Sequence, residues 1–226
     1  MDKLIWDYLL QRIDNPYGVA GLMGNLYVES KLNPKLLESS FARKIGLTSD
    51  EYTQLVDSQK YANFAHDGGG YGLAQWTFWT RKQGLLEAAQ KAHKSIGDLD
   101  LQLDYLWTEL QSYKTVVNTL KTAKSVREAS DVVVVRYEKP KNQSEKFLAN
   151  RANYGQKYFD AYANPKKMVY PTENRVNVRV GNGLNYKRIR QVNKGDSFEY
   201  VTTVGEWHAI VIGDQVGWIS AEYSKV

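Results

Sequence analysis

Apolar residues recur with two different spacings along this chain of 226 residues. Up to about residue 164 they recur every three or four positions, as Ile5, Leu9 and Ile13 do, which places them on one face of a helix. From Val176 onward they alternate with polar residues, as far as Val178 and beyond, which is typical of β-strands. The pattern predicts an α+β chain, with a mainly helical part followed by a small all-β barrel.

The second predicted helix has clear ends. Asn15 is a typical N-cap, Pro16 fits the first helical position, and Asn33-Pro34 stops the helix. Further helices are predicted to begin near residues 49, 76, 98, 126 and 143, the one at 76 running to Ala92 and the last to Tyr162.

Three glycines, Gly18, Gly21 and Gly24, stand three positions apart in the second helix and give it one very small face. Glycine lowers the intrinsic propensity of a segment to form a helix. We therefore expect another backbone, or a ligand, to approach this face closely.

The change of spacing falls at NPKKMVYPTEN, a short stretch marked by prolines. The predicted domains are therefore residues 1–164 and 173–226, joined by a linker over 165–172. Apolar runs in the second domain are separated by Gly205, Gly213 and Gly217, as turns between strands would be.

Composition excludes several classes of protein. There is no cysteine, which rules out disulfides, thiolate metal sites and cysteine nucleophiles. No apolar run approaches the ~18 residues of a membrane span. Acidic residues interrupt the N-terminal segment, so a signal peptide is not expected either. The net charge of +5 is spread along the chain, which favours a solvated surface over a nucleic-acid partner.

Metal and serine chemistry have no support in the sequence. Only three histidines occur, His66, His93 and His208, and none stands at a metal-ligand spacing. There is no Gly-x-Ser-x-Gly motif, and the glycines at 68–70 are not followed by the lysine of a phosphate loop. No metal and no cofactor are expected, and carboxylate chemistry remains.

Glu29 is the leading catalytic candidate, because it lies in the last turn of the glycine-faced helix. There the negative end of the helix dipole favours a protonated carboxyl, as a general acid requires. The segment 71–76 supplies an amide and flat rings of the kind that bind sugar hydroxyls and pyranose faces. The expected substrate-binding residues are Tyr71, Gly72, Gln75 and Trp76. Trp79 is a further candidate for the cleft wall, and Trp107 is expected in the core.

The segment GLMGNLYVESKLNP followed by GGGYGLAQWT resembles the phage tail lysozyme family of the lysozyme-like superfamily. The Glu-Ser pair followed by Gly-Leu-x-Gln is also similar to lytic transglycosylases and goose-type lysozymes. Two later segments, DLDLQLDYL and RYEKP, resemble further elements of the family. The resemblance covers most of residues 5–160. It implies a peptidoglycan glycosidase whose catalytic glutamate is Glu29 and whose cleft includes Gln75.

A second catalytic acid would decide between two reactions. A hydrolase needs a second carboxylate as base or nucleophile, whereas a lytic transglycosylase can use one glutamate, because a hydroxyl of the sugar itself attacks. The sequence gives no distances between carboxyl groups, so the choice between hydrolase and transglycosylase stays open. The candidates for the second acid are Asp50, Glu51, Asp57, Asp67 and Glu138.

The C-terminal part resembles a bacterial SH3-like domain over residues 173–226, from VNVRVGNGLNY through GEW to GWI. Such domains commonly bind bacterial cell walls. The resemblance implies wall contacts through exposed side chains, for which the candidates are Tyr186, Trp207, Tyr223 and Arg179. Trp218 is expected to fill the barrel core.

Together these features predict a phage or phage-derived lysin that cleaves the β-1,4 bonds of peptidoglycan and is anchored to Gram-positive wall. Such a protein, made without a signal peptide, would reach the wall after holin-type release or as part of a phage particle. Two alternatives stay open: a cell-wall peptidase or amidase, and a non-catalytic wall-binding tail protein. The sequence does not specify the oligomeric state.

Overall fold

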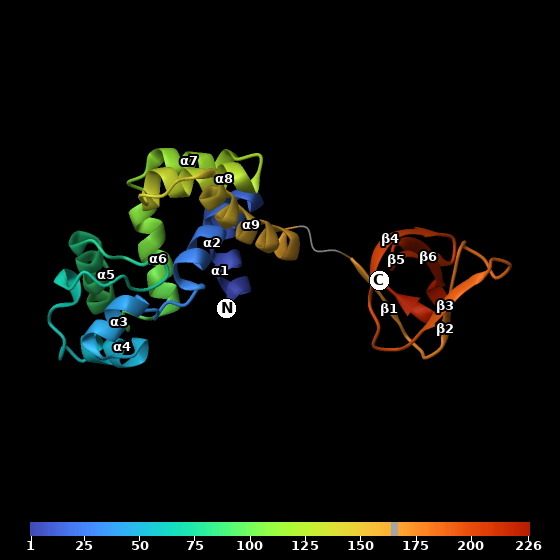
Figure 1. Cartoon of the computed structure of the whole chain (residues 1–226), viewed down its shortest axis with the longest axis horizontal. Helices are drawn as coiled ribbons and strands as arrows, with labels where there is room; N and C mark the ends of the chain where they lie inside the picture. The colour runs from blue at the N-terminus through green and yellow to red at the C-terminus, as the bar shows by residue number, and fades with distance from the viewer. Residues whose placement is uncertain (164–166) are drawn as a thin grey trace. The chain divides into compact units, whose positions relative to one another are not determined.

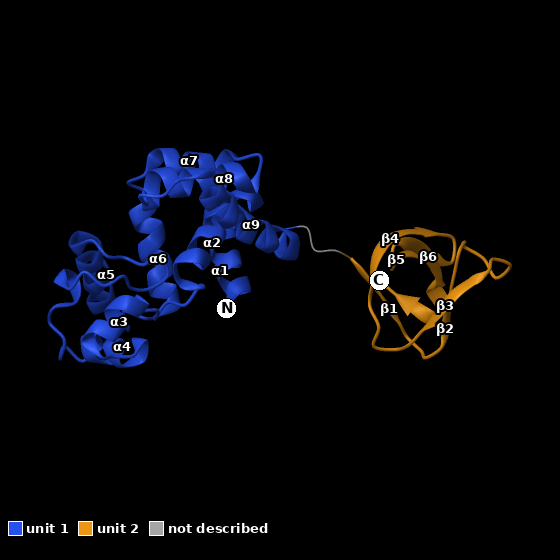
Figure 2. Ribbon diagram, viewed as in Figure 1, with its two compact units in different colours: residues 1–163 blue, residues 164–226 orange. Residues whose placement is uncertain are grey.

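A computed structural model describes residues 1–163 and 167–226 of the chain. The chain divides into two units, residues 1–163 and residues 164–226 (Figure 2). The first unit is helical and the second is a curled antiparallel sheet, which confirms the predicted α+β fold class. No helix among the described residues is long and apolar enough to cross a membrane.

The first unit contains helices of very different lengths (Figure 1). They are α1 (Asp2–Ile13), α2 (Pro16–Ser30), α3 (Ser39–Ile45), α4 (Ser49–Asp57), the 3-10 turn η1 (Phe64–His66), α5 (Trp79–Ala92), α6 (Leu99–Leu110), α7 (Lys114–Thr122), α8 (Val126–Val132), the π-helical turn η2 (Val133–Glu138) and α9 (Glu145–Tyr162).

Helix α2 is the centre of this unit, because ten of its 15 residues are buried. Helices α1, α7, α8 and α9 pack around it. A Cβ atom on Gly21 would lie 2.6 Å from the backbone nitrogen of Ser130 in α8, and one on Gly18 or Gly24 would overlap the backbone of α7 or α9. The prediction that another backbone approaches the glycine face is therefore confirmed.

Some predicted helix boundaries are wrong. The helix predicted from Trp76 begins only at Trp79, because Trp76 pairs with Tyr71 in a tight hairpin. The last helix begins at Glu145 rather than at 143. The sequence pattern does not predict helices α3 and α7. Both are short: α3 has seven residues and α7 has nine.

The second unit is one antiparallel sheet in the strand order β3-β2-β6-β5-β4-β1-β7. Its core is aliphatic, with Val178, Ile210 and Ile219 fully buried. The strands are β1 (Met168–Pro171), β2 (Val176–Arg179), β3 (Arg188–Val192), β4 (Phe198–Val204), β5 (Trp207–Ile212), β6 (Gln215–Ser220) and β7 (Ser224–Lys225), with the 3-10 turn η3 (Ala221–Tyr223) before β7.

The predicted linker over 165–172 is too long at its C-terminal end. Residues 168–171 form strand β1, which pairs with β4 through Val169 and Phe198 and with β7 through Pro171 and Ser224. Val169 is fully buried in the core, so this stretch belongs to the sheet. The Asn164-Pro165 boundary lies outside the described residues.

Candidate active site

Glu29 lies in the last turn of α2, where the sequence places it, and its side chain is 25% exposed. The next residue, Ser30, donates its hydroxyl to the carbonyls of Leu26 and Leu73, at 3.1 and 2.9 Å. Leu73 belongs to the glycine-rich segment, residues 68–77, so this bond connects that segment to the end of α2. The two sequence motifs therefore meet at the residue that follows Glu29.

A buried arginine from α9 contacts Glu29. Arg151 donates from Nη2 to Oε1 of Glu29 at 2.6 Å, and its Nη1 lies 3.3 Å from Oε2 of Glu138. The side chain of Arg151 is 5% exposed and that of Glu138 is 10% exposed. One guanidinium group therefore lies between two carboxyl groups. Because a buried cation needs a negative partner, at least one of these carboxyls is ionised.

The two carboxyl groups share a hydrogen bond. Burial, opposed by the charge of Arg151 and reinforced by Glu29, raises the pKa of the Glu138 carboxyl to about 8. At neutral pH Glu138 therefore keeps its proton and can donate it in a hydrogen bond to Glu29. Glu138 ends the π-helical turn η2, a local irregularity that is frequent at functional sites.

Sequence reasoning missed Arg151, although a signal was present. Arg151 lies on the same face of α9 as Leu148, Ala152 and Gly155, and this face packs inward. A charged residue in a buried stripe requires a charged partner. The sequence could not identify that partner, because Glu29 lies 122 positions away.

Glu138 is the candidate second acid that shares Arg151 with Glu29. Hydrogen-bonded carboxyls are closer together than the ~5–5.5 Å of a retaining glycosidase or the ~6.5–9.5 Å of an inverting one. The hydrogen bond between the two carboxyls favours Glu138 as a partner of the acid, and its role as a second acid stays a prediction.

The other candidate acids bond elsewhere. Asp50 pairs with Lys35 at 3.2 Å on the surface. Glu51 accepts a hydrogen bond from the backbone of Thr48 in the capping box of α4.

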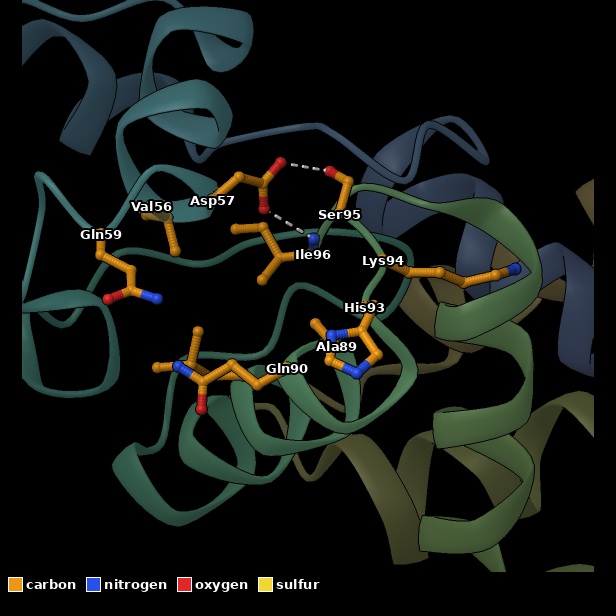
Figure 3. Close-up of a pocket in the computed structure, with 10 residues that line it drawn as sticks. Val56, Asp57, Gln59, Ala89, Gln90, His93, Lys94, Ser95 and Ile96 are labelled. Carbon is orange, nitrogen blue, oxygen red and sulfur yellow. Dashed lines mark hydrogen bonds between the residues drawn. The ribbon is translucent and has the colours of Figure 1, made fainter.

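Asp57 lies at a hollow of about 670 Å³ between the ends of α4 and α5 (Figure 3). Its carboxylate accepts hydrogen bonds from the Ser95 hydroxyl at 2.5 Å and from the Ile96 backbone nitrogen at 2.9 Å. Both carboxylate oxygens thus hold the loop that follows α5. This arrangement assigns Asp57 a structural role.

Asp67 is buried under the glycine-rich segment in an ion pair with Lys82. The Nζ atom of Lys82 lies 2.5 Å from Oδ1 of Asp67, and the two side chains are 0% and 2% exposed. Lys82 also donates to the Gly69 carbonyl at 2.8 Å, and Tyr52 donates its hydroxyl to Asp67. The pKa of Lys82 is lowered by burial, while the charge of Asp67 opposes this effect. The ion pair therefore holds the glycine-rich segment in place through the Gly69 carbonyl.

Two of the predicted substrate-binding rings are core residues, and the prediction that they line a cleft is wrong. Tyr71 and Trp76 are fully buried. The Tyr71 hydroxyl shares a hydrogen bond with Thr53 at 2.6 Å, and the Trp76 indole donates to Glu109 at 3.0 Å. Trp107 packs partly buried against the same core, as expected. Large amphipathic rings suit a core as well as a cleft, and here their polar ends find buried partners.

Gly72 and Gln75 shape the turn between these rings. Gly72 is buried, has a φ of +75°, and leaves no room for a Cβ against the Gln102 amide. The Gln75 side chain, half-buried, donates to the carbonyls of Leu36 and Gly72 at 2.9 and 3.1 Å. Its amide nitrogen therefore braces the turn. Contact between Gln75 and a substrate stays a prediction.

Comparison with known families decides the relationship. The model of the phage tail lysozyme family matches residues 1–162, and that of the bacterial SH3 domain matches residues 174–225. The chain belongs to the phage tail lysozyme family. No curated relative matches it. The two matches confirm the predicted pairing of a lysozyme-like part with a C-terminal SH3 domain, and they point to peptidoglycan-lytic activity and to cell-wall binding.

In the SH3 domain of this phage tail lysozyme family member, several predicted wall-binding residues are accessible. Tyr186 and Tyr223 are exposed, and Trp207 is half-buried. Arg179 donates from Nη1 to the Tyr186 carbonyl at 2.9 Å, and the Tyr186 ring packs closely on Gly181. Arg179 and Tyr186 therefore form one surface. A role for these residues in wall binding stays a prediction.

The prediction that Trp218 fills the core of the SH3 domain is wrong. Its neighbour Ile219 is fully buried in that core, and side chains alternate along a strand. Trp218 therefore lies on the opposite face of β6, half-buried beside its strand partners Arg179 and Ala209.

Proposed function

We propose that the protein cleaves the β-1,4 glycosidic bonds of peptidoglycan, with Glu29 as the general acid. The observation that carries this proposal is the partly exposed Glu29 carboxyl, which shares the buried Arg151 with Glu138, a carboxyl whose pKa is raised to about 8 by burial. A general acid must keep a transferable proton at the working pH, and two coupled carboxyls supply one.

The proposed reaction begins when a glycosidic oxygen comes within hydrogen-bond distance of Glu29. Glu138 passes its proton to Glu29, Glu29 donates a proton to that oxygen, the bond from the oxygen to the sugar carbon breaks, and the electron pair stays on the leaving oxygen. An oxocarbenium-like centre develops on the sugar. The negative charge that is left on the carboxyl pair remains beside Arg151, whose buried cation lowers its energy.

The geometry favours a mechanism with a single acid. Glu138 keeps its own proton at neutral pH because its pKa is raised to about 8, so it is poorly suited to act as a base or nucleophile. In a lytic transglycosylase no second acid is needed, since a hydroxyl of the sugar itself attacks the oxocarbenium-like centre and its proton returns to Glu29.

Mass spectrometry of muropeptides released from purified wall tests this function. We expect new sugar ends in anhydro form, and their identity shows which of the two sugars is cut. Hydrated ends would show that water attacks, and a second carboxylate would then have to be sought. New amino termini without new sugar ends would contradict the proposal and indicate a peptidase or amidase. Intact wall would indicate a non-catalytic tail protein.

We further propose that the SH3 domain anchors the enzyme to Gram-positive wall and so raises its local concentration on an insoluble substrate. The enzyme would reach the wall after holin-type release or as part of a phage particle. Co-sedimentation of the full chain with purified wall tests the anchor. Tyr186→Ala should reduce the bound fraction, whereas Leu184→Ala, an exposed residue nearby in sequence, should not. Equal binding by both variants would exclude the Arg179–Tyr186 surface.

A further inference from the structure

Exposed aromatic side chains gather at the start of α5. Phe78 is 61% exposed and Trp79 is 50% exposed. The His66 ring stacks on Trp79, with ring centroids 5.6 Å apart and planes inclined by 23°. These residues line a hollow of about 450 Å³, which we call the Trp79 hollow. Its described lining residues are Ala65, His66, Gly68, Thr77, Phe78 and Trp79.

The local structure does not require aromatic residues at positions 78 and 79. Phe78 occupies the N-cap position of α5 and makes no side-chain cap hydrogen bond. Ser, Thr, Asp and Asn are preferred at that position because they accept a hydrogen bond from the first turn. Half of the Trp79 side chain faces solvent and contributes little to the core. Residues that break local rules without structural gain are expected at functional sites.

The chemistry of the hollow favours a neutral ring as its ligand. Flat aromatic faces cover the apolar face of a pyranose, and the hydroxyls at the sugar's edge need polar neighbours. The exposed side chains of His66 and Thr77 supply such neighbours. None of the lining residues described above is Lys, Arg, Asp or Glu, so the hollow offers no ion-pair partner to an anionic polymer.

The hollow is joined to the candidate active site through the glycine-rich segment. One end of that segment is held by the bond from Ser30 to Leu73, directly after Glu29. Further along, the Thr77 hydroxyl donates to the Gln75 carbonyl at 3.0 Å, and Phe78 and Trp79 follow. The same stretch of chain that borders Glu29 therefore leads into the hollow.

We propose that the Trp79 hollow binds a neutral pyranose ring of the glycan strand, away from the bond that Glu29 cleaves. The identity of the strand rests on the function proposed above, whereas sugar binding at Trp79 does not. The hollow would hold a long strand in register while its scissile bond lies at Glu29.

Titration of the full chain with N-acetylglucosamine hexamer tests this site. The indole N–H signal of Trp79, assigned in a nitrogen-15 NMR spectrum by its loss in Trp79→Phe, reports on the hollow. A Glu29→Gln background prevents turnover. We expect that signal to shift on titration, and Trp79→Ala to weaken binding by about fivefold or more. Trp79→Phe should retain most of the affinity because it keeps a flat ring.

Leu4→Ala is the matched control, because Leu4 is an apolar side chain 65% exposed on α1. Unchanged hexamer affinity in both Trp79→Ala and Phe78→Ala, with circular dichroism showing folded protein, would overturn the proposal. If Trp79→Ala does not fold, Phe78→Ala and the indole signal decide. If the protein cleaves wall but its indole signal does not shift, only the Trp79 site is excluded. If the protein binds hexamer at Trp79 but does not cleave wall, only the proposed glycosidase function is excluded.

Discussion

Replacing Glu138 by glutamine should remove a large part of the pH dependence of stability. In the folded chain the Glu138 carboxyl keeps its proton up to a pKa of about 8, against an ordinary value of 4.5. Below pH 4.5 both the folded and the unfolded chain hold this proton. Between these two values the unfolded chain releases it and the folded chain does not. The free energy of unfolding of the wild type should therefore fall as the pH rises from about 4.5 to about 8.

The size of this effect follows from the proton that is bound differently. One proton changes the free energy of unfolding by about 1.4 kcal/mol for each pH unit. Between pH 5 and pH 8 the wild type should lose about 2–4 kcal/mol relative to Glu138→Gln, the lower figure allowing for rearrangement around Arg151. The charged groups around Glu138 are Glu29 from α2, Arg151 from α9 and Arg81 from α5, and all remain in the variant.

Urea unfolding at pH 5, 6, 7 and 8, followed by circular dichroism of the helices, measures this difference. Glu87→Gln is the control, because Glu87 is exposed on α5 and its loss leaves the buried pair intact. Glu138→Gln should show a flatter dependence of unfolding free energy on pH than either the wild type or the control. Parallel curves for all three proteins would refute the reasoning that Glu138 is held protonated.

Substitutions at four further positions probe the same framework. Arg151→Met should lower the free energy of unfolding by about 3 kcal/mol, and Arg151→Lys by less, in urea titration at pH 7, because the buried Glu138 and the partly exposed Glu29 lose their cation. Lys82→Met should cost about 3–5 kcal/mol in the same assay, since Asp67 is left buried and unpaired. Gly24→Ala should lower the stability by about 1–3 kcal/mol, measured by thermal unfolding, because its Cβ meets the α9 backbone. Gln75→Ala should lose about 1–2 kcal/mol through two broken hydrogen bonds, and an unchanged melting temperature would instead assign Gln75 to substrate contact alone.

Helix starts with local capping chemistry could be predicted from the sequence. Asn15 accepts from the backbone of Tyr17 at the start of α2, and Asp98 accepts from Leu101 at the start of α6. Each bond spans two or three residues, so neighbouring letters of the sequence contain both partners. The position of Glu29 at the end of α2 follows in the same way.

The surroundings of Glu29 could not be predicted, because they depend on contacts between distant segments. Glu138 reaches the site through a π-helical turn that has no clear sequence signature. Arg151 approaches from the last helix, and its partner depends on how α9 packs against the glycines of α2. The burial of Tyr71 and Trp76 was also hidden, since the same ring types suit a core and a sugar-binding cleft.

Cleavage of purified peptidoglycan by Glu29→Gln tests the central claim most directly. Glutamine keeps the size of the side chain and can still accept a hydrogen bond from Arg151, but it has no proton of the required acidity to transfer. General acid catalysis contributes about 10²–10⁴-fold, so the rate at which new sugar ends form should fall by at least about 100-fold. The variant should remain folded, because Glu138 can then ionise beside Arg151, and it should still bind wall. The control Glu87→Gln should cleave at the wild-type rate. A folded Glu29→Gln protein that releases muropeptides at a near-normal rate would contradict the account.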